Sequence, residues 1–381
     1  MAAPVSAVDI QQQNFLQRRA VIANALKMKQ QIYSKTVTPS SENVLNIPPR
    51  PAGLLLGFIV EVTGSVTDGG AGPTDRTIFG NANMVSQFRF DDLSGYTRIQ
   101  TPGWHLAMLN SARQGFGYGG AYANAIPMGY GDNFPVYQGA NPIADAGVQP
   151  LRMQYYVPIS YSATDLRGSI DMAVTNAVAN LQITLNTNPF AAAGDSMGAI
   201  YAGHAGDWTD TVTVTVWQVY LDQIPRDPST GVKILPFLDM NTVYDIKQTT
   251  FRGLTANQDF PMPYTNNRSF LSTFVVYNNG NDFNNGSDVT DFSLVSANFT
   301  NIWRVPPEIL ALDARMTFMT DVPLGTYYVE SRDMPVNTIN YGNMELNIKP
   351  SLVNADAYCA VGYESFALVN QLVGATSLAG G

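Results

Sequence analysis

Few residues of this sequence have the types and the spacing that catalysis or cofactor binding requires. Gly115, Gly117 and Gly120 match the pattern G-x-G-x-x-G, in which glycines let a strand-to-helix turn approach a pyrophosphate. That motif needs a helix directly after it, whereas the segment that follows, AYANAIPMGYGDNFP, contains two prolines and more glycines. We therefore interpret GFGYGG as a loop and not as a nucleotide site.

The histidines and the cysteine do not form a recognisable nucleophilic or metal site. The chain has two His, His105 and His204, and one Cys, Cys359. Neither GWHLAML nor YAGHAGDW has a nucleophile-elbow pattern, a zinc site lacks ligands, and the oxygen-rich run NNGNDFNNGSD lacks the spacing of a calcium loop. We expect structural roles for all three residues, and no catalytic residue, metal or cofactor. A single cysteine excludes an internal disulfide framework and suits folding in a reducing cytoplasm.

Charged residues are scarce and unevenly placed. They make up 13% of the chain, against the usual ~25%, and 45% of the residues are apolar. The net charge of −9 argues against direct binding of nucleic acid, which requires a basic surface. Residues 1–35 nevertheless contain Arg and Lys residues against the single acid Asp9. A basic arm therefore precedes an acidic body, much of whose surface must be covered by neutral side chains or by other protein.

The segment 8–35 has the apolar period of a helix and contains neither Gly nor Pro. We predict an N-terminal amphipathic helix here, and an extended linker in TVTPSSENVLNIPPRP. The helix could dock on the body or lie on an anionic lipid surface, and both alternatives stay open. The residues of its apolar stripe and its basic residues form the candidate membrane-facing or assembly arm: Phe15, Arg18, Arg19, Ile22, Leu26, Lys27, Lys29 and Tyr33.

Two further absences bear on where the protein acts. MAAPVSAVDIQQQ lacks the apolar stretch of a signal peptide, so we do not expect secretion by that route. No run approaches the ~20 apolar residues of a membrane span.

After Pro51 the period of the sequence changes to two, which is typical of strands with one buried face. Only six of the 30 acidic residues are Glu, and the excess of Asp favours turns over helices. A chain of 381 residues is long enough for two cores, so we expect two β domains. The clearest alternating segments are Phe58–Val62, Leu181–Leu185, Val212–Val216 and Phe270–Tyr277, followed by TYYV, MELNI and YCAVGYESF.

The two halves of the chain are separated by residues 225–268, a plausible inter-domain crossing rich in turn residues. A short helix is expected to open at Pro306-Pro307-Glu308, because proline and an acid favour the first turn. QYYVP at 154–158 and TYYVE at 326–330 each precede a turn-rich segment and further strands. This weak duplication signal permits two related sandwiches without establishing them.

Several longer segments resemble a known family. GWHLAMLNSARQG, VPISYSATDLRG, GAIYAGHAG, WQVYLDQIP, ILPFLDMNTVYDI, LTANQDF and INYGNMELNIKP, in this order, are similar to the major capsid protein of the tectiviruses. These are tailless double-stranded DNA phages with a membrane inside the protein shell, and the likeness is closest to those of Gram-negative hosts. It extends from about residue 10 to about residue 366.

The resemblance implies an all-β double jelly roll, two eight-stranded β-sandwiches in one chain, with the helix at the N-terminus. It further implies a pseudo-hexagonal homotrimer that builds an icosahedral shell around an internal membrane, with the helix on the membrane side. Implied partners are neighbouring capsomers and vertex and minor capsid proteins, and no catalytic residue is implied. The expected location is the virion, after synthesis in the host bacterial cytoplasm. The expected division is residues 1–50 as helix and linker arm, 51–245 and 246–366 as jelly rolls, and 367–381 as a C-terminal arm.

Residues 66–80, 117–150 and 278–291 match the family poorly, and we expect them to be outer-surface or gap-filling loops. The alternative function is a carbohydrate-binding or carbohydrate-active β-sandwich protein, for which 19 Tyr and many Asp would supply a sugar-binding surface. The basic N-terminal helix and the ordered family segments favour the coat protein.

Overall fold

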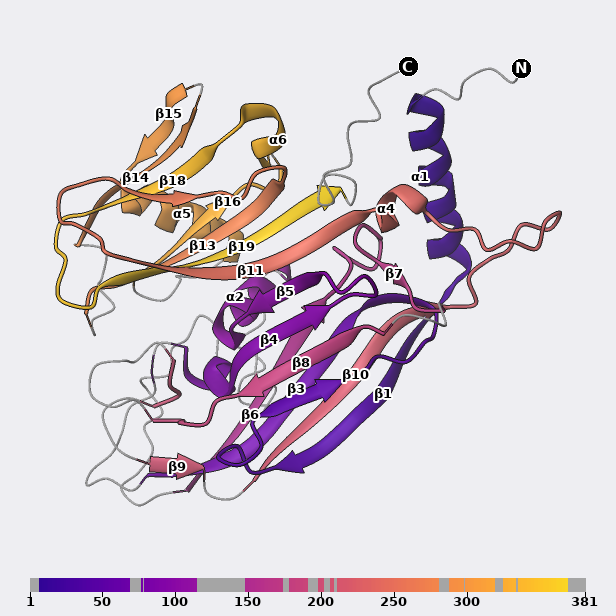
Figure 1. Ribbon diagram of the computed structural model, residues 1–381, viewed down its shortest axis with the longest axis horizontal. Coiled ribbons are helices and arrows are strands. Elements are labelled where there is room, and N and C mark those ends of the chain that lie inside the picture. The colour runs from indigo at the N-terminus through magenta and orange to yellow at the C-terminus, as the bar shows by residue number, and fades with distance from the viewer. Residues whose placement is uncertain are drawn as a thin grey trace.

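Most of the regular structure in the computed structural model is β-strand, and the strands form three sheets (Figure 1). It describes residues 7–68, 77, 79–114, 148–173, 178–190, 198–201, 206–208, 211–280, 288–297, 299–318, 325–333 and 335–368. The GFGYGG loop, His204, most of the NNGNDFNNGSD run and residues 369–381 of the expected C-terminal arm lie outside these ranges.

The first sheet belongs to the N-terminal half of the chain. Its strands, in spatial order, are β1 (Leu26–Val37), β10 (Val212–Asp222), β3 (Leu54–Asp68) and β6 (Val148–Pro158), with β7 (Ile170–Asp171) and β9 (Gly206–Trp208) paired to the two ends of β3.

The second sheet runs through both halves of the chain. From the N-terminal half come β2 (Val44–Ile47), β8 (Asn180–Leu185), β4 (Val85–Asp91) and β5 (Thr97–Thr101). From the C-terminal half come β11 (Thr242–Arg252), β19 (Tyr358–Leu368), β13 (Ser269–Asn278) and β16 (Thr326–Glu330), with the short β17 (Val336–Asn337) paired to β13. The third sheet consists of β12 (Phe260–Pro263), β18 (Met344–Pro350), β14 (Val289–Ser296) and β15 (Phe299–Val305).

These strands form two sandwiches of the same topology. When the short β7, β9 and β17 are left out and strands are counted within each half, both sandwiches have the order 1-8-3-6 in one sheet and 2-7-4-5 in the other. That order in a two-sheet sandwich is a jelly roll. The expected double jelly roll is therefore confirmed. The segments QYYVP and TYYVE lie in β6 and β16, the sixth strand of each roll, so the weak duplication signal pointed to equivalent strands.

Alternation along the strands places the cores as expected. In β10 the valines 212, 214 and 216 are fully buried, whereas the residues between them are half-buried. In β13, by contrast, both sets of alternating residues are buried. One set, including Val275 and Tyr277, faces the core of the second roll, and the other, including Phe274 and Val276, joins the core cluster of the first.

The two rolls are joined side by side within one chain. β5 of the first roll pairs in parallel with β11 of the second, Ile99 with Ile246. The helix α2 (Gly103–Gln114) directly follows β5. It contacts β4, β6, the short 3-10 helix η1 (Gly80–Met84) and, in the second roll, α5 (Pro307–Phe318). α5 begins at the predicted Pro307-Glu308 turn. The short helices α4 (Phe237–Met240) and α6 (Thr338–Tyr341) precede β11 and β18.

The extent of the N-terminal helix was predicted wrongly. α1 spans Ala7–Asn24, and residues that were expected to continue it to 35 form β1, which pairs with β10 along its whole length. The expected linker contains β2. The expected inter-domain crossing at 225–268 contains β11 and β12, so the connection between the rolls is shorter, and the expected boundary between Asp245 and Ile246 falls inside β11.

Candidate functional site

Helix α1 is held against one end of the first roll by a buried carboxylate. Asp239 on α4 accepts two hydrogen bonds from the guanidinium of Arg18, each 2.5 Å, and one from the Asn14 side chain at 3.0 Å. Asn14 in turn accepts a hydrogen bond from the backbone N–H of Leu238, so its side chain binds two adjacent residues of α4. Val21 of α1 is fully buried in a cluster on the outer face of the first sheet. These contacts fix the helix on the body.

The eight predicted arm residues therefore separate into two groups. Phe15, Arg18, Arg19 and Ile22 lie on α1, and Leu26, Lys27, Lys29 and Tyr33 lie on β1. Ile22 packs on the Val21 cluster and Tyr33 on the main core. The expected single stripe from residue 15 to residue 33 does not exist, because the chain changes from helix to strand between them.

The outer side of α1 carries exposed apolar residues among polar ones. Phe15 is 51% exposed and Leu16 57%, and the Arg19 guanidinium lies 5.8 Å from the Phe15 ring centre. Phe237 and Leu238 on α4, which contacts α1, are exposed as well. Leu16, Phe237 and Leu238 were not among the residues predicted from the sequence. The run ILPFLDM could have indicated the last two, because two large apolar residues follow a proline that can start a helix there.

Both ends of the described chain lie near this surface. α1 contacts α4, and Leu368 at the end of β19 pairs with Thr242, two residues after α4 (Figure 1). β3 begins under α1 at Leu54 and ends at Asp68, next to β9 and the start of β6. The expected outer loops 66–80 and 117–150 thus connect to strand ends remote from α1.

The junction between the rolls buries most of α2. The His105 ring is fully buried, meets the Phe274 ring edge to face at 5.7 Å, and shares a 2.6 Å hydrogen bond with the Thr101 hydroxyl through Nδ1. Its Nε2 has no hydrogen-bond partner. Burial lowers the pKa of His105 to about 3, against an opposing effect of Glu364. His105 is therefore neutral and packed, not a general base in contact with solvent.

Two buried carboxylates lie in the same junction region. Glu364 on β19 accepts hydrogen bonds from Tyr244 at 2.7 Å and Ser272 at 2.8 Å, and Arg332 lies 3.7 Å away. Each carboxylate is thus neutralised or hydrogen-bonded, as a buried charge requires.

The other carboxylate, Asp245 on β11, forms an ion pair with Arg268 and accepts a hydrogen bond from the Tyr96 hydroxyl of the first roll at 3.0 Å. Tyr96 also accepts a hydrogen bond from the Lys247 ammonium at 3.1 Å. This network links the two rolls through polar groups.

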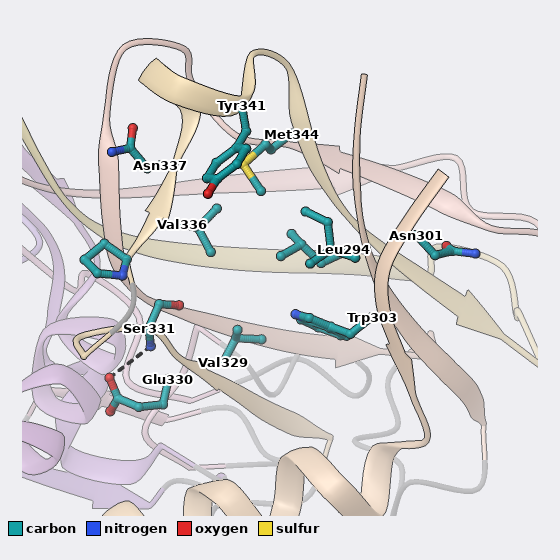
Figure 2. A pocket seen from close by; sticks show the side chains of 12 residues that line it. Leu294, Asn301, Trp303, Val329, Glu330, Ser331, Val336, Asn337, Tyr341 and Met344 are labelled. Atoms are coloured by element: carbon teal, nitrogen blue, oxygen red, sulfur yellow. Dashed lines mark hydrogen bonds between the residues drawn. The ribbon is translucent and has the colours of Figure 1, made fainter. Parts of the chain in front are cut away.

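The corner of the second roll that corresponds to this junction is open. A cleft of about 760 Å³ lies there between the two sheets, beside the edge strand β15 (Figure 2). Its apolar wall consists of Leu294, Trp303, Val329, Val336, Tyr341 and Met344. The cleft has none of the clustered titratable side chains that a reaction would need; Glu330 at its margin accepts a hydrogen bond from the backbone of Ser331.

Other chemical sites are not found in the part of the chain that the structure describes. Cys359 is fully buried, and burial raises the pKa of its thiol, which suppresses nucleophilic reactivity. Within the described ranges no group of three or more His, Cys, Asp or Glu is arranged to hold a metal ion. None of the helices in these ranges is long and apolar enough to span a membrane.

Two jelly rolls side by side in one chain are the fold of the double jelly-roll class of viral coat proteins. The structure is similar to a chain in the atomic structure of Sulfolobus turreted icosahedral virus, with a TM-score of 0.62 and 12% identity over 91% of this chain and 93% of that one. It is also similar to VP54 of PBCV-1, with a TM-score of 0.58 and 11% identity over 90% and 94% of the two chains.

The chain belongs to the P3 major capsid protein family, whose N-terminal model matches residues 1–224 and whose C-terminal model matches residues 241–380. It is 34% identical to major capsid protein P3 of Enterobacteria phage PRD1 over 371 residues, 96% of this chain and 93% of that protein. The protein is thus a major capsid protein, a structural component of a phage virion and not an enzyme. The carbohydrate-binding alternative receives no support from these relatives.

Proposed function

We propose that three copies of this protein form a pseudo-hexagonal capsomer and that the α1 end of each capsomer faces a membrane inside the shell. The observation that most supports the trimer is the repeat within the chain: two rolls of one topology stand side by side, so three chains supply six similar units for a closed ring. Neighbouring capsomers and vertex and minor capsid proteins would then contact the sides of this ring.

The membrane-facing role is supported by the chemistry of the α1 end. Phe15 and Leu16 present an exposed apolar surface, and Arg19, Lys27 and Lys29 are exposed cations on α1 and the adjoining β1. Arg18 serves this surface indirectly, because its ion pair with Asp239 holds the helix in place. A basic residue near an anionic bilayer contributes about 1 kcal/mol, so three would contribute about 3 kcal/mol per chain. A trimer multiplies this weak attraction by presenting three such surfaces at once.

Flotation with lipid vesicles tests this role. Arg19, Lys27 and Lys29 would be changed together to Gln, and purified protein mixed with anionic vesicles at low and at high salt. We expect the wild type to float and to lose binding as salt screens the charges, and the triple variant to remain at the bottom. Arg18 stays unchanged, so that the docking of α1 is preserved.

A matched control removes the same charge elsewhere. Arg89, Arg252 and Lys349, which lie on strands of the body, are changed to Gln in a second triple variant. This control should float like the wild type. Equal flotation of all three proteins would refute a membrane contact through α1.

We also place synthesis in the cytoplasm of the host bacterium. The lone cysteine, buried and unpaired with another cysteine, is compatible with a chain that folds under reducing conditions.

A further inference from the structure

Another cavity opens between the two rolls at the α1 end of the molecule. It has a volume of about 340 Å³, within the ~300–1,000 Å³ of typical ligand pockets. Thr242 in its wall begins β11 shortly after α4, and α4 contacts α1 (Figure 1). Tyr161 in the opposite roll follows the end of β6 at Pro158, which pairs with Gly57 near the start of β3. The cavity therefore belongs to the same end of the protein as the exposed residues of α1.

Two arginines line this cavity, one from each roll. Arg167 comes from the first roll and Arg332 from the second, and the described residues of the lining include no carboxylate. The apolar and aromatic part of the wall consists of Tyr161, Leu271, Pro335, Ile339, Phe366 and Ala367. Guanidinium groups set among apolar side chains have the chemistry of a site for an amphipathic anion.

Arg167 is held in place with part of its guanidinium unused. Its Nε and Nη2 donate hydrogen bonds to the Asp165 carboxylate at 3.0 and 2.6 Å, and its Cζ lies 4.2 Å from the centre of the Phe366 ring. Its Nη1 has no hydrogen-bond partner in the part of the chain that the structure describes, and 39% of the side chain is exposed. The free edge of this guanidinium can therefore donate to an anion while the ion pair with Asp165 persists.

The loop that carries Arg167 is closed by its own hydrogen bonds. The backbone N–H of Tyr161 donates to the carbonyl of Arg167 at 2.9 Å, and the Ser162 hydroxyl accepts a hydrogen bond from the backbone N–H of Asp165 at 2.9 Å. These bonds fix the backbone on both sides of the ion pair. Because the guanidinium is positioned before a ligand arrives, little conformational entropy is lost on binding.

Arg332 is held by carboxylates as well. Its Nη1 lies 3.5 Å from Glu330 and its Nη2 3.7 Å from the buried Glu364. Since Asp165 is paired with Arg167, each cation of the cavity already has an anionic partner. The cavity therefore offers directed N–H donors and not a surplus of positive charge. It suits a ligand with an anionic oxygen beside apolar groups, and the phosphodiester of a lipid next to its acyl chains is such a ligand.

We propose that this cavity binds the phosphate of a membrane lipid headgroup, with Arg167 and Arg332 as its cationic groups and Ile339 beside the adjoining apolar part of the lipid. Ile339 lines the cavity and is 41% exposed, so it also reaches the surface. The proposal rests on the membrane-facing role of the α1 end and adds a defined lipid site to it. Both walls come from one chain, so the site is complete in a single copy.

Calorimetric titration of the purified protein with a short-chain phosphatidylglycerol, kept below its critical micelle concentration, tests the site. We expect saturable binding of one lipid per chain, and Arg167→Gln should weaken it by about tenfold or more. Arg226→Gln, which removes an exposed cation from the loop between β10 and α4, should leave the affinity unchanged. Ile339→Trp fills the cavity but keeps both arginines, and it should weaken binding as strongly as Arg167→Gln. Lipid binding that persists at full affinity in either folded variant would overturn the proposal.

Inorganic phosphate distinguishes a lipid site from a site for free phosphate. It lacks the apolar groups that would contact Ile339, so it should bind about tenfold or more weakly than the lipid. Equal affinity for the two would overturn the lipid assignment. Flotation keeps this proposal apart from the one on which it rests. A wild-type protein that does not float with anionic vesicles would refute the membrane-facing role, whereas a protein that floats but shows no saturable binding of the short-chain lipid would refute only this site.

Discussion

The buried imidazole at the junction predicts a specific loss of stability in acid. The pKa of His105 is about 3 in the folded protein and 6.5 in an unfolded reference. As the pH falls below 6.5, the unfolded chain takes up a proton at this residue and the folded protein does not, so unfolding becomes more favourable. The effect is absent above pH 6.5 and complete near pH 3.

The size of this effect follows from the difference in pKa. At about pH 5 the proton taken up by the unfolded chain favours unfolding by about 2 kcal/mol, and the limit near pH 3 is about 5 kcal/mol. Glu364, the charged group that opposes the shift, is itself hydrogen-bonded to Tyr244 and Ser272, so it does not turn toward His105 to form a pair. The loss of stability in acid therefore arises from His105, which lies at the junction between the two rolls.

Urea unfolding at pH 7 and at pH 5 measures the effect. His105→Asn can still accept the hydrogen bond of the Thr101 hydroxyl and does not titrate. We expect the variant to be less stable than the wild type at pH 7, because packing is lost, but to lose about 2 kcal/mol less between pH 7 and pH 5. Acid-sensitive carboxylates contribute equally to both proteins and cancel in this difference. An identical pH dependence of the two unfolding midpoints would refute the assignment of a neutral, buried His105.

Three further outcomes are expected. Arg18→Ala should leave the Asp239 carboxylate buried without its cation, at a cost of about 3 kcal/mol, and release α1 to limited proteolysis, whereas Arg18→Lys should release it less. Gly362→Ala should lower the thermal midpoint, since the new Cβ would lie 2.2 Å from the His105 ring, and His105→Ala in the same chain should restore part of the loss. The Cys359 thiol should react with a disulfide reagent only in denaturant, and fast reaction of the native protein would contradict its burial.

The β class of the fold was predictable because strands such as β10 alternate between buried and half-buried residues, whereas the double jelly roll followed only from the resemblance to the capsid family. Val212, Val214 and Val216 have one buried face whatever the sheet order, and the period of two survives in the sequence. The pairing of β5 with β11 was not predictable, since register between distant strands depends on tertiary contacts and not on local pattern.

β1 shows how a local pattern can mislead. Residues 8–35 lack Gly and Pro, and Phe15, Ile22, Leu26 and Tyr33 fit one helical face, yet pairing with β10 overrides that preference after Asn24. The alternation of Leu26 and Met28 with lysines, followed by Thr36 and Val37, was the signal for a strand. This strand pattern is shorter than the helical period of residues 8–35, so the helical interpretation was preferred for the whole segment.

The candidate arm was predictable only in part for a related reason. Exposed Phe15 and Arg19 follow from an amphipathic reading, but the pairing of Arg18 with Asp239 joins residues 221 positions apart. A sequence shows that Arg18 is charged and does not show which distant carboxylate it meets. The buried helix α2 was missed as well, because polar residues such as Asn110 and Ser111 are buried on it alongside apolar ones, and that burial comes from tertiary contacts and not from a local pattern.

Some of the neutral residues that give this sequence its low content of charge lie on the helices α2 and α5. On α2 and on β13 the neutral side chains are buried because a second roll lies against them in the same chain. On α5, by contrast, the apolar residues Ile309, Leu312 and Met316 are exposed in the part of the chain that the structure describes. An isolated soluble protein tends to avoid contiguous exposed apolar surface, so we expect the exposed apolar residues of α5 to be covered when the coat protein assembles into a shell.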